Sequence, residues 1–181
     1  VYGEGTANSD LLKLIDYDHV HKEVLFSVVH RDDEEHLLKL LDDRFELSKP
    51  NHGIVFTIPL KEVITNKGRC PRTETKESTQ MNYEVIFVVV DNHRGDEVVD
   101  IANSYGAKGA TIIHGRGSGV HEKGSIFNIT IEPEKEVVMI LVKEDIHAEI
   151  LEGLSKELKI DEPGNGIIFS AGVNNALGLV E

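Results

Sequence analysis

Two glycine-rich turns and one lysine are the residues of this chain best suited to binding an anion. The first turn is Gly115-Arg116-Gly117-Ser118-Gly119, and the second is Pro163-Gly164-Asn165-Gly166. Glycines let a backbone turn sharply and bring its N–H groups close to an anion. Together with the positive charges of Arg116 and Lys135, the backbone donors of both turns would form a cradle for phosphate groups.

This cradle forms only if the elements that carry it belong to one sheet. Apolar, β-branched runs predict four strands, at Tyr83–Asp91, Ala110–His114, Glu136–Val142 and Ile167–Ala171. Apolar residues at helical spacing predict a helix over His93–Tyr105, capped by Asp91 or Asn92 and ended by Gly106. They predict a second helix over Ile146–Leu158, capped by Asp145.

The predicted order is therefore β-α-β-β-α-β. This is the ferredoxin-like split βαβ pattern, an α+β fold in which two helices cover one face of an antiparallel sheet. In that fold both glycine turns and Lys135 converge at the same edge of the sheet.

The same pattern occurs twice along the chain. Glu23-Val24 corresponds to Glu136-Val137, and Gly53-Ile54-Val55-Phe56 corresponds to Gly166-Ile167-Ile168-Phe169, a constant offset of 113 residues. A register kept through a strand, a helix and a second strand indicates two copies of one small domain. We expect a first lobe at residues 1–64, a linker at 65–82 and a complete second lobe at 83–181.

The first copy lacks counterparts of the first strand and first helix of the second. It retains a predicted strand at Glu23–Val29, a helix at Asp33–Arg44 and a strand at Gly53–Ile58. By comparison with the complete copy, we expect about thirty residues to precede Val1. The linker is polar, which predicts a mobile segment.

Composition excludes several classes of function. The formal net charge of −13 argues against a nucleic-acid partner, because such binding depends on neutralising phosphates with Lys and Arg. The single cysteine, Cys70, forms no internal disulfide, and no secretion signal or membrane-spanning run is evident, which favours the cytoplasm. No Ser/His/Asp arrangement or spaced carboxylate pair indicates an enzyme.

Taken together, the motifs resemble the PII signalling proteins, the nitrogen regulatory protein P-II superfamily. Gly115-x-Gly117 precedes a long loop. After the loop come the run Glu-Val-Val-Met-Ile-Leu-Val and a helix. The last motif is Gly164-x-Gly166-Ile-Ile-Phe. The resemblance covers Tyr83–Glu181 and, in truncated form, Val1–Lys67, so the chain looks like a tandem two-lobe member.

The resemblance implies a regulator rather than an enzyme. PII-like proteins are trimers whose open sheet faces turn inward, and they bind adenine nucleotides or related ligands in clefts between subunits. The ligand reshapes the T-loop, here Arg116–Glu134, which docks on a partner enzyme or membrane transporter, in nitrogen metabolism for the family at large. The implied ligand-binding residues are Gly115, Arg116, Gly117, Lys135, Gly164, Asn165 and Gly166, with Gly3, Gly5, Lys22 and Gly53 at the matching positions of the first copy.

The chain departs from nitrogen-sensing PII proteins in its basic residues. Ile167 and Ile54 stand where those proteins have a lysine after the second glycine of the turn, and Gly172–Glu181 contains no Lys or Arg. ATP, ADP and AMP all stay open as effectors.

Two other functions are compatible with the same architecture. One is a metal-responsive protein that resembles the CutA-like proteins, with four histidines as candidate ligands: His19, His21, His114 and His121. The other is a trimeric scaffold that has lost its ligand. No His/Cys spacing in the chain matches a structural zinc site.

Overall fold

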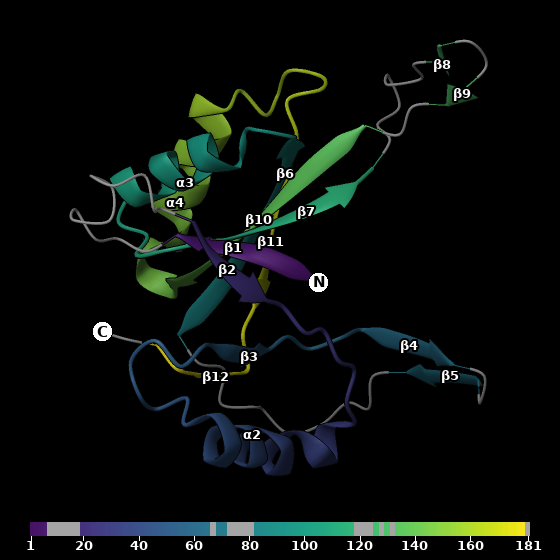
Figure 1. Cartoon of the computed structure of the whole chain (residues 1–181), viewed down its shortest axis with the longest axis vertical. Helices are drawn as coiled ribbons and strands as arrows, with labels where there is room; N and C mark the ends of the chain where they lie inside the picture. The colour runs from purple at the N-terminus through teal and green to yellow at the C-terminus, as the bar shows by residue number, and fades with distance from the viewer. Residues whose placement is uncertain are drawn as a thin grey trace. The chain divides into compact units, whose positions relative to one another are not determined.

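The computed structural model describes residues 1–6, 19–65, 68–71, 82–117, 125–126, 129–130 and 133–179. Internal contacts divide the chain into two compact units (Figure 1). The first combines Val1–Leu25 with Glu84–Ser170, and the second combines Phe26–Tyr83 with Ala171–Glu181. These boundaries differ from the lobes expected at 1–64 and 83–181, and the tandem-lobe organisation stays a prediction.

The first unit is built on a six-stranded sheet with the strand order β11-β6-β10-β7-β1-β2. Helices α3 (Gly95–Ser104) and α4 (Glu144–Glu157) lie on one face of this sheet (Figure 1). The strands of the second copy are β6 (Tyr83–Asp91), β7 (Thr111–Arg116), β10 (Glu134–Lys143) and β11 (Ile167–Gly172). The order β-α-β-β-α-β confirms the predicted α+β, ferredoxin-like fold, with the two-residue strands β8 (Ser125–Ile126) and β9 (Ile129–Thr130) between β7 and β10.

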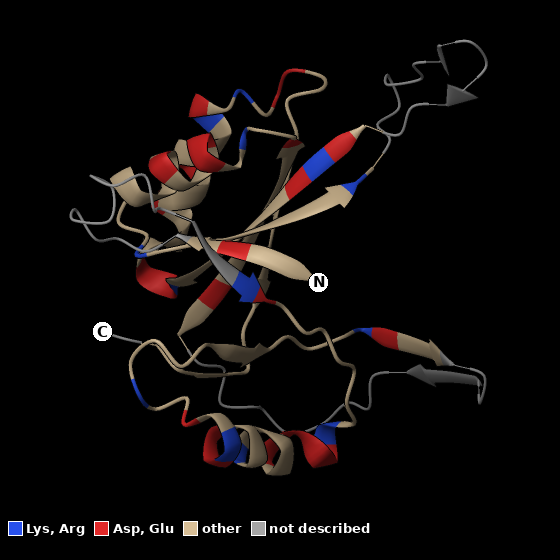
Figure 2. Cartoon of the chain, viewed as in Figure 1, with Lys and Arg blue, Asp and Glu red and all other residues tan. Residues whose placement is uncertain are grey.

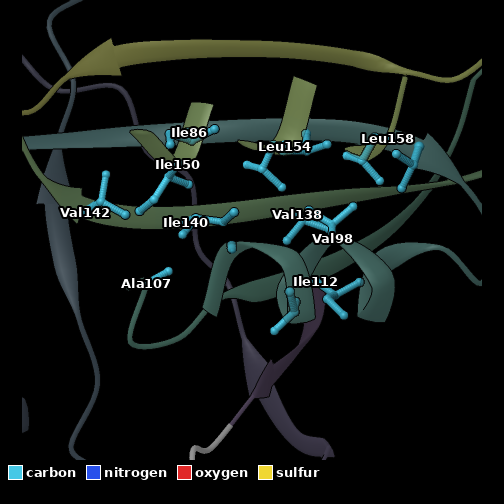
Figure 3. Close-up of a cluster of buried hydrophobic side chains, with 14 residues drawn as sticks. Ile86, Val98, Ala107, Ile112, Val138, Ile140, Val142, Ile150, Leu154 and Leu158 are labelled. Atoms are coloured by element: carbon cyan, nitrogen blue, oxygen red, sulfur yellow. The ribbon is translucent and has the colours of Figure 1, made fainter. Parts of the chain in front are cut away.

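Strict alternation along the central strand β10 turns one of its faces into the core. Every second residue of β10, from Glu136 to Val142, is buried, and its neighbours are half-buried. Helix α4 places Ile150 and Leu154 on the same side (Figure 3). Each such side chain contributes about 1.5–3 kcal/mol when fully buried. The aliphatic core residues drawn in Figure 3 are Ile86, Val98, Ala107, Ile112, Val138, Ile140, Val142, Ile150, Leu154 and Leu158.

The predicted helix caps are wrong. The N-cap of α3 is Arg94 and that of α4 is Lys143, and neither side chain caps its helix. At α3 a tertiary contact takes over the capping function, because the buried Glu136 carboxylate accepts the Gly95 N–H at 2.6 Å. A negative charge at this position also interacts favourably with the helix dipole.

The first-copy strands extend the sheet of the second copy. Strand β1 (Tyr2–Thr6) pairs with β2 (His19–Glu23) on one side and with β7 on the other. The strand predicted at 23–29 is wrong beyond Glu23, since residues 24–30 have no regular structure. Val24 N–H still donates to the Val1 carbonyl, and the next residue, Leu25, is 88% exposed.

The second unit contains α2 (Arg31–Phe45) and β3 (Val55–Thr57), close to their predicted positions. Strand β12 (Asn175–Leu177), which the sequence did not predict, pairs with β3. The Glu34 carboxylate of α2 joins them by accepting hydrogen bonds from the Thr57 hydroxyl at 2.6 Å and the Asn175 amide at 2.7 Å. Strands β4 (Glu62–Thr65) and β5 (Gly68–Pro71) form a hairpin that overlaps the start of the expected linker at residues 65–82.

None of the helices in the described part of the chain has the length and apolar character needed to cross a membrane.

A hydrogen bond between Tyr105 and Glu157 links the C-terminal ends of α3 and α4. The Tyr105 hydroxyl donates to Glu157 Oε1 at 2.9 Å. The pKa of Tyr105 is raised above its usual value. The hydrogen bond is the larger cause, and the negative charge of Glu157 is the second. The neutral phenol is therefore the form that the folded protein favours.

We predict that the link contributes stability below the pKa of an unfolded tyrosine, about 10, and is lost as the pH rises through the higher folded value. The melting temperatures of wild type and Tyr105→Phe should therefore differ at neutral pH and converge at alkaline pH. Ultraviolet titration of the phenolate, as the difference between the two proteins, should give Tyr105 a pKa above the usual tyrosine value of about 10. A normal Tyr105 titration, unchanged in Glu157→Gln, would contradict the assignment.

Candidate functional site

The ends of three strands meet at one edge of the sheet in the first unit. In the antiparallel pairing of β7 with β10, Lys135 lies opposite Gly115 and Glu134 lies opposite Arg116. The end of β6 joins them, because Asn92 N–H donates to the Glu134 carbonyl at 3.2 Å. The structure therefore brings Gly115, Arg116 and Lys135 together, as the hairpin around the predicted loop requires.

These strand ends enclose an open pocket of about 480 Å³. Two of its lining residues, Arg116 and Glu134, are also the last residue of β7 and the first of β10. The pocket therefore lies at the base of the loop between these strands. Its lining consists of Asn92, His114, Gly115, Arg116, Glu134 and Lys135.

The cations of the pocket are accompanied by carboxylates (Figure 2). Lys135 Nζ forms an ion pair with Asp91 Oδ1, and the Lys135 side chain is only 15% exposed. The Glu134 carboxylate accepts a hydrogen bond from the Asn92 side-chain amide at 2.9 Å. A ligand anion at Lys135 therefore meets an ammonium group that already has a partner.

His114 connects the pocket to the rest of the sheet. Its Nδ1 lies 3.4 Å from the buried Glu136 carboxylate, and its Nε2 lies 3.8 Å from Glu4 of β1. Glu136 in turn accepts the Gly95 N–H at the start of α3. The pocket wall is thus tied both to a helix N-terminus and to a first-copy strand.

The second glycine turn lies beside the end of β6. Gly166 has a φ of +127°, and a Cβ at this position would lie 2.5 Å from the Val89 carbonyl oxygen, so only glycine fits. The Arg94 guanidinium reaches the turn and donates to the Asn165 carbonyl at 3.4 Å. Gly164, with a φ of +95°, is exposed to solvent.

Two of the expected anion donors are already engaged within the chain. Gly117 N–H donates to the Pro133 carbonyl at 3.2 Å, which continues the β7–β10 pairing. Asn165 N–H donates to the Glu162 carbonyl at 3.3 Å inside its own turn. The positive character of the pocket therefore comes more from side chains, and less from backbone N–H groups, than the sequence predicted.

The sequence model of the nitrogen regulatory protein P-II family matches residues 83–179, more than half of the chain. The chain belongs to the P-II family. No curated protein sequence matches it.

Among solved structures, the chain is similar to Arabidopsis thaliana PII bound to citrate and to the B. subtilis GlnK–ATP complex. The first match has 21% identity and a TM-score of 0.37, and covers 50% of this chain and 74% of that chain. The second has 15% identity and a TM-score of 0.40, and covers 53% and 95%.

The first-copy residues that the P-II resemblance singled out do not form a glycine turn. Gly3 and Gly5 lie within β1, and Lys22 lies opposite Gly3 in β2. A Cβ on Gly5 would lie 2.9 Å from Lys22 Cε, so glycine makes room for the lysine stem. Gly53 belongs to the other unit. It follows a turn before β3 and has a φ of +120°.

Sequence reasoning missed four residues of the P-II pocket region: Asp91, Asn92, His114 and Glu134. In the sequence Asp91 and Asn92 look like helix caps, and His114 looks only like a metal candidate. A hairpin register of β7 with β10 would have found His114 and Glu134, because the first residues of β10 lie opposite the last of β7. Asp91 and Asn92 follow only from the position of β6, which no local pattern gives.

The structure describes only some of the four histidines proposed as metal ligands. His121 and the side chains of His19 and His21 lie outside the described residues. His114 contacts two carboxylates. Within the described ranges, no group of three or more His, Cys, Asp or Glu side chains has a metal-binding arrangement.

We predict that Glu136 stabilises this P-II fold by satisfying the buried N–H group at the start of α3. Glu136→Ala should lower the free energy of unfolding by about 1–3 kcal/mol, the cost of leaving a buried donor unpaired. Glu136→Gln, which keeps an acceptor, should lose less. Urea unfolding followed by far-ultraviolet circular dichroism measures the change.

Glu134→Ala is the matched control, because Glu134 lies on the same strand but is exposed. Equal losses in the Glu134 and Glu136 variants would show that the buried hydrogen bond is not the cause.

Proposed function

We propose that this P-II family member is a signal transducer that binds a small anionic effector, an adenine nucleotide, in the pocket at the ends of β7 and β10. Family membership and the convergence of Gly115, Arg116 and Lys135 on one pocket support this proposal. The turn at Gly164–Gly166 lies beside the same end of β6 and completes the proposed binding site.

The position of the pocket suggests how the effector would act. Arg116 and Glu134 line the pocket and are also the two ends of the loop between β7 and β10. A ligand that binds Lys135 competes with Asp91 for this cation, and at Arg116 it comes close to Glu134, so it changes the contacts at the base of the loop. We propose that this loop, Arg116–Glu134, carries the signal to a partner enzyme or membrane transporter.

The family description places such regulators in nitrogen control, and we propose the same setting for this chain, in the cytoplasm and without catalysis of its own. The partner would recognise the loop in one ligand state and not in the other. A loop-swapped variant that still binds the effector but no longer regulates the partner would separate the two activities.

Lys135→Ala should weaken adenine nucleotide binding by about tenfold or more, because one of the two side-chain cations that line the pocket is removed. A thermal-shift screen with ATP, ADP, AMP and citrate identifies the ligand, and titration calorimetry measures the loss. At a ligand concentration a hundred times the Kd, the wild type should gain about 2.7 kcal/mol of stability.

Lys143→Ala is the control, since Lys143 lies at the opposite end of the same strand. If neither nucleotides nor citrate bind the wild type, the proposed effector site is wrong.

We also propose that the chain forms a trimer through the sheet face opposite α3 and α4. Phe87 and Phe169 stack there with ring centroids 5.0 Å apart, and Ile167 is 62% exposed. Exposed apolar side chains that gather on one face are typical of interaction surfaces. The family architecture, in which open sheet faces turn inward, supports a trimer over other assemblies.

Phe169→Glu should therefore convert the assembly to monomers, because a charge would be buried at the interface without a partner. Sedimentation velocity measures the change in mass. Leu25→Glu is the control, since Leu25 is exposed but lies outside the sheet. A monomeric wild type, or an unchanged mass in the Phe169 variant, would contradict the trimer.

A further inference from the structure

The charges around the pocket restrict the ligand it can bind. Two side-chain cations line the pocket, Arg116 and Lys135, and two carboxylates lie beside them, Asp91 and Glu134. These four charges sum to zero. A polyanionic ligand would therefore find no excess of positive charge on the described strands.

Asp91 holds the more deeply placed cation. The Lys135 side chain is 15% exposed and its ammonium contacts the Asp91 carboxylate, which is 50% exposed. A phosphate that binds this ammonium must come within a few ångströms of the carboxylate, where like charges repel strongly. The repulsion grows with the number of negative charges on the ligand.

Glu134 is the acidic residue that the strand pairing places nearest to the other cation. It lies opposite Arg116 in the β7–β10 register, and its carboxylate is held in place by the Asn92 amide. A second phosphate placed at Arg116 would approach this fixed negative charge. The pocket therefore opposes an extended chain of phosphates at both of its cations.

The described residues of the two glycine turns add few further donors. The backbone N–H groups of Gly117 and Asn165 are engaged by carbonyl groups of the chain. Residues 160–181, which include the second glycine turn, contain no Lys or Arg. Arg94 reaches this turn, but its guanidinium also forms an ion pair with Glu97 at 2.8 Å.

We propose that the pocket selects a nucleotide that carries a single phosphate over a nucleoside triphosphate, and that Asp91 determines this selectivity. The inference rests on the function proposed above and specifies its ligand class. A monophosphate carries about −1.5 to −2 charges and can exchange with Asp91 at Lys135. A triphosphate places additional charge beside Asp91 and Glu134.

Titration calorimetry of the full chain with AMP, ADP and ATP, without divalent cations, tests this order. The wild type should bind AMP about tenfold more tightly than ATP, with ADP between them. Asp91→Asn keeps the size of the side chain and removes its charge. In this variant ATP binding should strengthen about tenfold, while AMP binding should change by a smaller factor.

Asp100→Asn is the matched control, because it makes the same change in net charge at an exposed position of α3. It should leave the order and the affinities unchanged. An equal gain for ATP in Asp100→Asn would show that overall charge, and not the ion pair at Lys135, sets the preference.

The possible failures are distinct. If ATP binds the wild type more tightly than AMP, the selectivity is wrong and the effector site stands. If Asp91→Asn leaves the ratio of ATP to AMP affinity unchanged, Asp91 does not determine the selectivity. If none of the three nucleotides binds, the nucleotide site and the selectivity fail together.

Discussion

The antiparallel register of β7 with β10 is the constraint on which both the core and the pocket depend. In this register the side chains of Glu136, Val138 and Ile140 are buried. The same alternation places Lys135 at the rim, opposite Gly115. A slip by one residue would expose the core side chains and move Lys135 away from the pocket, so hydrophobic burial fixes the geometry of the binding site.

Local patterns predicted the second copy well because its strands are long and apolar. The apolar, β-branched runs of β6 and β10 are easily recognised as strands, and the helical spacing of Ile150 and Leu154 leaves little choice of face. The helix caps were not predictable, because Glu136 reaches Gly95 from a strand more than forty positions away in sequence. Residues 24–30 also have a strand-like sequence, but in the structure they are irregular, and Leu25, Phe26 and Val28 are exposed.

The candidate site was predictable in part for the same reason. Glycine turns and the basic residues Arg116 and Lys135 are visible in the sequence, and the hairpin between β7 and β10 brings them together. The carboxylates of Asp91 and Glu134 were not recognised, because each has an ordinary local explanation at a strand end. The strand pairing shows that Glu134 lies opposite Arg116, and the ion pair shows that Asp91 lies beside Lys135.

The ion pair between Lys135 and Asp91 explains how the pocket can be stable without a ligand and still selective with one. A lysine ammonium with little solvent exposure needs an opposite charge, and Asp91 provides it in the empty pocket. Ligand binding is then a competition between two anions for one ammonium. Once displaced, Asp91 remains at the entrance of α3, where its carbonyl accepts the Arg94 N–H. The Asp91 side chain is 50% exposed, so water can solvate the displaced carboxylate and a ligand of modest charge can take its place at Lys135.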